Sequence, residues 1–162
     1  MNEIESKKLI LKHYEESIKY IDSLKGIANN CWIAPIEKSK WSVCEIVGHL
    51  IPWDKFILEK RLPYLLIPNS VLVKPNVQQM NSRAAFESLN MMKEEVIKQF
   101  SQTRLKLVNE MKKIPAEEFN KVFSIGASVL TVAEYFNGLI EHDLHHFQQI
   151  NVFLYKFDGM EH

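Results

Sequence analysis

Apolar residues recur along this chain at steps of three and four positions, the spacing of one buried face of an α-helix. Residues 3–25 show it first, and their apolar stripe consists of Ile10, Tyr14, Ile18, Ile21 and Leu24. Gly26 predicts the end of this helix, because glycine readily adopts the left-handed conformation found after helix C-termini. No segment alternates convincingly between apolar and polar residues, so no β-strand is predicted.

Ser42 and Glu45 predict the start of a second helix, because Ser-x-x-Glu is the pattern of a capping box. The inward face of this helix consists of Val43, Ile46, Val47, Leu50, Trp53 and Ile57. Pro52 lies inside it, where it removes one backbone donor and crowds the carbonyl group of Gly48. We therefore expect a kink about one turn after His49.

Residues 62–80 contain three prolines and little periodicity, which predicts a long irregular connection that crosses a bundle end or covers a site. A third helix is expected from Asn81 or Ser82 to about Lys113, just before Pro115. Its core side is interrupted near Thr103 and consists of Val96, Phe100, Leu107, Met111 and Ile114.

Thr131 and Glu134 form a second capping box, and Leu130 and Tyr135 are placed to add a hydrophobic staple. The predicted inward stripe of this fourth helix consists of Val132, Tyr135, Leu139, His142, His146, Ile150 and Phe153. Four amphipathic helices without strands predict an all-α four-helix bundle, with a single domain over residues 1–162.

Histidines replace apolar residues in the fourth stripe. His142 and His146 are at positions i and i+4, so one helix face carries both imidazoles. His49 independently falls on the inward side of the second helix. Three neutral imidazoles with an open position are typical of a catalytic zinc site, and bundles build such sites between facing helices. The sequence therefore favours one metal shared by His49, His142 and His146 over three hydrogen-bonded core histidines.

Three neighbouring residues are weaker candidates for a catalytic role. His145 lies three positions after His142, which can also bring two ligands together, but it falls off the stripe and is expected at the rim. Gln149 either donates or accepts within the pocket or lies at the bundle edge as an ordinary polar residue. Glu45 is expected to serve the capping box, with an acid–base role as the alternative.

Other metal arrangements fit the sequence less well. No Glu-x-x-His pair occurs, which argues against a di-iron bundle. Asp143 follows His142 where a zincin protease has its glutamate base. His13 and His162 have no partner pattern and are expected to be solvated.

Two segments resemble the DinB/YfiT-like superfamily of small metalloenzymes. Trp41-Ser42-Val43-Cys44-Glu45-Ile46-Val47-Gly48-His49-Leu50 resembles the opening of that family's second helix, Trp-Ser-x-x-Glu-Ile-x-x-His-Leu. Residues 130–135 and the later His142-x-x-x-His146-x-x-Gln149-Ile150 resemble its last helix. Pro52 after His49 departs from the family's pattern.

The resemblance implies a four-helix bundle that holds one divalent ion through His49, His142 and His146 and that often forms homodimers. Zinc is the expected metal, with nickel, iron or manganese as alternatives. Characterised members include zinc-dependent transferases of low-molecular-weight thiols, so the resemblance implies a bacillithiol-type S-transferase acting on a small molecule. The alternatives are a metal-dependent hydrolase and a non-catalytic bundle in which the metal is structural or absent.

Charge and composition narrow the classes of partner. Lys and Arg total 20, as do Asp and Glu, so a net charge of zero gives no electrostatic case for nucleic acid or an anionic membrane. The sequence contains no run of 18 or more apolar residues, so no membrane span is predicted. Residues 1–8 lack the apolar stretch of a signal peptide. Cys31 and Cys44 have no metal-type spacing and are expected to be buried thiols in a reducing compartment. We therefore expect a cytoplasmic protein.

Overall fold

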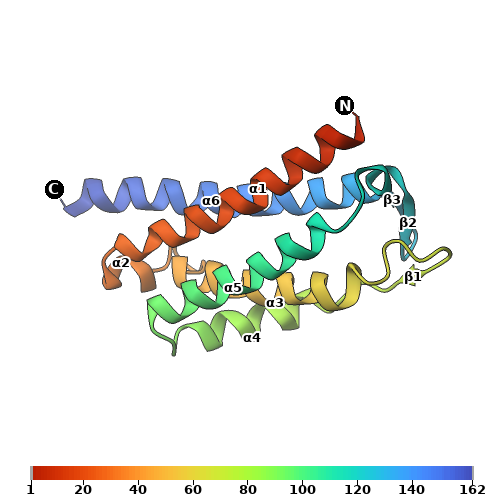
Figure 1. Cartoon of the computed structure of the whole chain (residues 1–162). Coiled ribbons are helices and arrows are strands. Elements are labelled where there is room, and N and C mark those ends of the chain that lie inside the picture. The colour runs from red at the N-terminus through yellow and green to blue at the C-terminus, as the bar shows by residue number, and fades with distance from the viewer. Residues whose placement is uncertain (1, 162) are drawn as a thin grey trace.

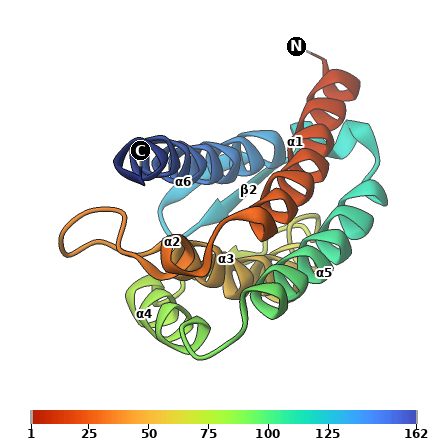
Figure 2. The same ribbon diagram turned by 90° about the vertical axis from the view of Figure 1, so that its left-hand side faces the viewer.

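Four long helices form the body of the protein in a computed structural model that describes residues 2–161, with side chains up to residue 158. They are α1 (Glu3–Ser23), α3 (Val43–Phe56), α5 (Lys93–Lys112) and α6 (Val132–Glu161). α1 packs against α5 and α6, and α3 packs against α5 (Figures 1 and 2). α2 (Asn29–Ile33) lies near one end of the bundle, and α4 (Val77–Ser88) covers the outer side of α3.

The predicted helix starts at Ser42 and Thr131 are confirmed by their hydrogen bonds. The Ser42 side chain accepts from the Glu45 backbone N–H, and the Glu45 carboxylate accepts from the Ser42 backbone, which completes a capping box. Thr131 Oγ1 accepts from the Glu134 N–H at 3.0 Å. These caps satisfy backbone donors that have no partner inside the helix, so they fix where α3 and α6 begin.

α3 continues through Pro52 to Phe56 and then widens into a π-helical turn at Ile57–Arg61. Such turns insert an extra residue into the helical ladder and rotate the residues beyond them. His49 lies in the α-helical part, upstream of both irregularities.

The prediction of one helix from residues 81–82 to 113 is wrong. Two helices, α4 and α5, occupy this region and are separated at residues 89–92. α4 begins at Val77 because the Asn76 side chain caps it, accepting from the Gln79 N–H at 3.2 Å. α4 packs closely on α3 at Gly48, where an added Cβ would meet the Ser88 Cβ at 2.4 Å. The irregular connection is therefore shorter than the predicted 62–80.

A small sheet is also present, so the expectation of a strictly all-α fold is corrected. β1 (Val71–Leu72) pairs in parallel with β2 (Val122–Ile125), and β2 pairs antiparallel with β3 (Ser128–Thr131). Gly126, with φ of +56°, lies in the turn between β2 and β3. The sheet closes the bundle end at which α6 begins (Figure 1).

Two apolar cores fill the bundle, one toward the sheet and one toward α2. On each long helix a polar residue separates them: Ser17 on α1, Asp54 on α3, Arg104 on α5 and Asp143 on α6. The middle of the bundle is thus a polar layer. No helix within residues 2–161 is both long and apolar enough to cross a bilayer.

Candidate metal centre

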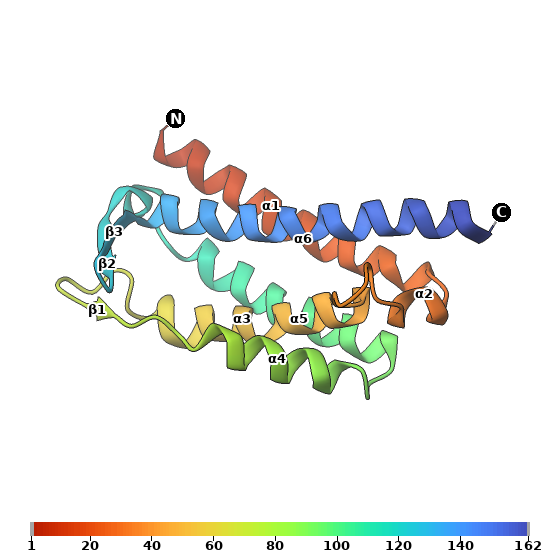
Figure 3. The ribbon, with the colours of Figure 1, turned by 180° about the vertical axis from the view of Figure 1, so that it is seen from behind.

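The three predicted ligands converge between α3 and α6 at the middle of the bundle. One ring nitrogen of each of His49, His142 and His146 lies within 4.8 Å of the others. The Nε2 atoms of His142 and His146 are 3.3 Å apart, and the His49 and His146 ring centroids are 4.7 Å apart. These three residues are called the histidine cluster below. α6 runs alongside α3 over this part of the chain (Figure 3).

Hydrogen bonds to the outer ring nitrogens fix which nitrogen faces the centre. Nδ1–H of His49 donates to the Ile46 carbonyl at 2.5 Å, and Nδ1–H of His146 donates to Gln149 Oε1 at 2.9 Å. A neutral imidazole has one donor and one acceptor nitrogen, so each Nε2 carries a lone pair. Nε2 of His49 is buried and has no hydrogen-bond partner. This second-sphere pattern is the one that orients metal-ligating histidines.

Burial keeps the cluster neutral. Burial first, and the neighbouring His146 second, lower the pKa of His49 from 6.5 to about 3. Burial likewise lowers the pKa values of His142 and His146. Neutral imidazole is the form that binds a metal, so no proton has to leave at neutral pH.

The three weaker candidates for a catalytic role differ in whether they contact the histidine cluster. Gln149 contacts the cluster directly through His146. The Glu45 carboxylate is engaged in the capping box, as expected. His145 is exposed, and its ring centroid lies 5.6 Å from that of His146, outside the three-nitrogen group.

The buried face of α6 is rotated from the predicted stripe. Phe136, Asp143 and Phe147 are buried, whereas Leu139 is half-buried and His142 is exposed. The histidines therefore lie at the edge of the buried face rather than at its centre. This position leaves the cluster open to solvent on the His142 side while His49 is sealed inside, which suits a site that must admit a ligand.

The polar layer lies directly beneath the cluster and was not predicted. Arg104 binds Asp54 through Nε and Nη2, both at 2.8 Å, and binds Asp143 through Nη1 at 2.6 Å. His13 Nε2 lies 2.8 Å from Asp143 Oδ2, and Ser17 accepts from Arg104 at 3.0 Å. His13 is therefore not solvated, contrary to the prediction, and His162 lies outside the described residues. The interruption of the third apolar stripe near Thr103 was the one sequence signal of this layer.

Charges in the polar layer shift the acidity of its carboxyl groups. Burial alone raises the pKa of Asp143, but the Arg104 charge and the His13 contact outweigh it and lower the value to about 2. Burial raises the pKa of Asp54, and Arg104 opposes that shift. The Arg104 guanidinium also lies over the Tyr14 and Phe100 rings, 4.8 Å from each centroid. Because Asp143 follows His142 in the chain, this layer fixes the rotation of α6 at the cluster.

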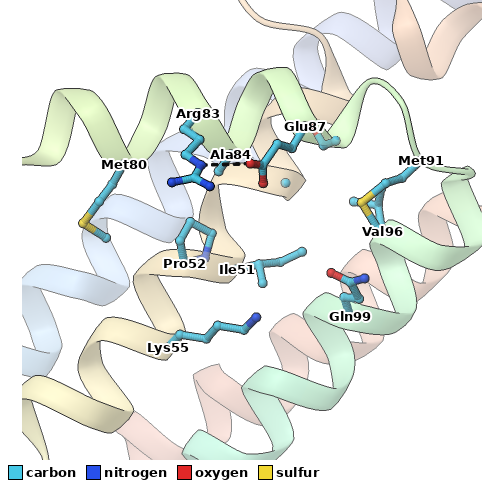
Figure 4. A pocket seen from close by; sticks show the side chains of 12 residues that line it. Ile51, Pro52, Lys55, Met80, Arg83, Ala84, Glu87, Met91, Val96 and Gln99 are labelled. Atoms are coloured by element: carbon cyan, nitrogen blue, oxygen red, sulfur yellow. Dashed lines mark hydrogen bonds and ion pairs between the residues drawn. The ribbon is translucent and has the colours of Figure 1, made fainter.

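Two hollows flank α3, and only one borders the histidines. A cavity of about 200 Å³ lies between Trp53, Leu139 and His142, above the polar layer. A second hollow, of about 290 Å³, lies between α3, α4 and α5 and has no histidine in its lining (Figure 4). Its polar rim includes Lys55 and an Arg83–Glu87 ion pair. Of these two hollows, the cavity beside His142 is therefore the one that adjoins the histidine cluster.

Comparison with known proteins agrees with this geometry. The sequence model of the DinB superfamily matches residues 13–150. The fold is similar to that of YfiT from Bacillus subtilis, described as a probable metal-dependent hydrolase with an unusual four-helix bundle topology, at a TM-score of 0.77 and 13% identity. The match covers 94% of this chain and 87% of that one. No curated protein matches the chain.

Proposed function

Because the chain belongs to the DinB superfamily, we propose that it is a metal-dependent hydrolase that binds one divalent ion through His49, His142 and His146. One observation carries the proposal: His49 Nε2 is a buried acceptor with no partner, on a ring 4.7 Å from that of His146. A buried polar atom without a hydrogen bond costs free energy unless a ligand satisfies it. A divalent cation would satisfy His49 Nε2, and it would also bind Nε2 of His146 and, in the tautomer that turns its lone pair inward, Nε2 of His142.

The donor set fits zinc. A tetrahedral zinc ion binds imidazole nitrogen at about 2.0–2.1 Å, which places two ligand nitrogens roughly 3.3–3.4 Å apart. His142 Nε2 and His146 Nε2 already have this separation, at 3.3 Å. Imidazole also suits nickel and iron, while manganese prefers oxygen ligands, so zinc is the metal we propose first.

Three histidines leave one tetrahedral position open, the arrangement of catalytic rather than structural zinc sites. When bound, the ion supplies Lewis acidity toward a carbonyl group or a water molecule. Gln149 holds the His146 ring in place, and Trp41 packs against the His49 ring with centroids 4.7 Å apart. These contacts pre-position the nitrogens, so binding the ion requires little rearrangement.

Metal analysis tests the proposal first. Protein purified without an immobilised-metal column should contain close to one equivalent of a divalent metal by mass spectrometry. Metal-loaded protein should hydrolyse members of a panel of small esters and amides, lose that activity on chelation and regain it with zinc. A protein that carries no metal and binds none on titration would overturn the proposal.

Thiol transfer, which the resemblance implies, is an alternative use of the same open position. No contact of the described residues favours a thiol over water. The same panel run with bacillithiol or glutathione, alongside thiol-reactive electrophiles, distinguishes the two reactions. Turnover that requires the thiol would replace hydrolysis as the assigned activity.

A further inference from the structure

The cavity beside His142 has apolar walls and a charged floor. Leu50, Trp53, Ile57 and Leu139 form the walls, and the polar layer forms the floor. At about 200 Å³ the cavity has room for several waters, and therefore for a small organic group. Since His142 lines it, a group in this cavity adjoins the proposed metal.

The floor cannot bind an anion. All five guanidinium N–H groups of Arg104 are engaged, by Asp54, Asp143 and Ser17, so none is left to donate to a ligand. Two carboxylates face one guanidinium, so the positive charge of Arg104 is already balanced within the layer. A ligand carboxylate or phosphate placed above this floor finds neither an unpaired cation nor a free guanidinium N–H group.

Tyr14 offers the cavity a hydrogen bond. It lines the cavity and is only 1% exposed, close to the charged groups of Arg104, Asp143 and Asp54. A tyrosine hydroxyl can both donate and accept, so Tyr14 gives this largely apolar cavity a neutral polar group for a ligand. Burial raises the pKa of Tyr14 well above 10, so the hydroxyl stays protonated and can donate.

We propose that this cavity binds the non-reacting part of the substrate, a small apolar group without negative charge that carries one hydrogen-bonding atom for Tyr14. The inference rests on the proposed function only in placing the reacting bond next to His142. The floor offers acidic substituents no unpaired cation, and the Tyr14 hydroxyl selects among neutral and cationic ones. The hollow in Figure 4 lies on the α4 side of α3 and takes no part.

Four probes of similar size test the selection: toluene, benzyl alcohol, benzylamine and benzoate. Binding is measured by calorimetry on zinc-loaded and chelator-treated protein. The shift of the Trp53 indole N–H signal locates each probe, because Trp53 lines the cavity and donates to Asn81. We expect benzyl alcohol and benzylamine to bind the metal-free protein at least tenfold more tightly than benzoate. Equal binding of benzoate would overturn the proposal.

Tyr14→Phe isolates the hydroxyl group, because it keeps the ring. It should weaken benzyl alcohol about three- to tenfold, the range of one hydrogen bond, and leave toluene unchanged. Leu139→Phe should fill the cavity and abolish binding of both. Gln99→Phe, in the hollow of Figure 4, is the matched control and should alter neither. Unchanged benzyl alcohol binding in Tyr14→Phe would remove Tyr14 from the proposal. If the protein takes up no metal on titration but still binds the probes with this selectivity, the proposed function is refuted and the cavity proposal stands.

Discussion

The histidine cluster and the polar layer lie side by side in the bundle, but they differ in how completely their atoms are paired. In the polar layer every N–H of Arg104 has an acceptor, and both oxygens of Asp54 receive hydrogen bonds. In the histidine cluster the inward nitrogens face one another, and His49 Nε2 has no partner. A fully paired cluster gains nothing from a ligand, whereas a buried acceptor without a partner is stabilised by one. The comparison therefore distinguishes the residues that stabilise the bundle from those proposed to bind a metal.

Removing Arg104 should have the largest effect. Arg104→Met leaves the carboxylates of Asp54 and Asp143 buried without their cation, and breaking a buried pair in this way costs about 3–5 kcal/mol. Urea unfolding followed by circular dichroism measures the loss. Lys113→Met, which removes an exposed pair with Glu110, should leave the unfolding midpoint unchanged. A loss below about 1 kcal/mol for Arg104→Met would mean that the polar layer does not stabilise the fold.

Removing a cluster histidine should instead abolish metal binding and spare the fold. His49→Ala, His142→Ala and His146→Ala should each raise the metal dissociation constant more than about 100-fold, beyond what second-sphere residues cost. Competition with a chromophoric chelator gives the constants. His145→Ala is the matched control, since its ring is exposed and outside the cluster. If His145→Ala loses the metal and His146→Ala keeps it, the ligand assignment is wrong.

Replacing Gln149 tests the hydrogen bond that orients His146 rather than a metal ligand itself. Gln149→Leu removes the acceptor that orients the His146 ring, so the metal dissociation constant should rise about ten- to hundredfold. The chelator competition that measures the histidine variants applies here too. Gln148→Leu, at the exposed neighbouring position, should leave the constant unchanged. Equal constants for the two variants would show that the hydrogen bond does not matter for binding.

The pH dependence of the metal-free protein tests the burial of the cluster. The folded protein holds the pKa of His49 at about 3, against 6.5 for the exposed group. Between these values the unfolded chain binds a proton that the folded one does not, so the free energy of unfolding falls as pH drops below 6.5. His49→Leu removes that contribution and should flatten the fall by up to about 1.4 kcal/mol per pH unit. If the free energies of unfolding of the wild-type protein and of His49→Leu change in parallel from pH 7 to about 4, the lowered pKa of His49 is contradicted.

Local patterns predicted those parts of the fold that depend on near neighbours in sequence. The Ser42–Glu45 and Thr131–Glu134 pairs predicted both helix starts, and the i, i+4 spacing of His142 and His146 predicted that they share a face. The same patterns missed the break near residues 89–92, because the close approach of α4 at Gly48 is a tertiary contact. They also missed the sheet, whose strands of two and four residues are too short for their alternation to be noticed.

Local sequence patterns could not predict the polar layer, for a related reason. Arg104 and its partners are 39, 50 and 87 positions apart, and His13 is 130 positions from Asp143. Nothing in the neighbourhood of His13 indicates a buried carboxylate on the last helix. A charged residue that interrupts an apolar stripe, as Arg104 does, is the signal to examine in similar sequences.

One residue of the polar layer from each long helix also constrains how the chain folds. A partly folded species that has docked α3 and α5 but not α6 leaves Arg104 without Asp143, and one without α3 leaves it without Asp54. Each such species would leave N–H groups of the buried Arg104 guanidinium without their acceptors, which costs free energy. Intermediates are thereby disfavoured, and the two apolar cores on either side of the layer should unfold as one cooperative unit. The slowly exchanging amide protons at both ends of the bundle should then share a single opening free energy.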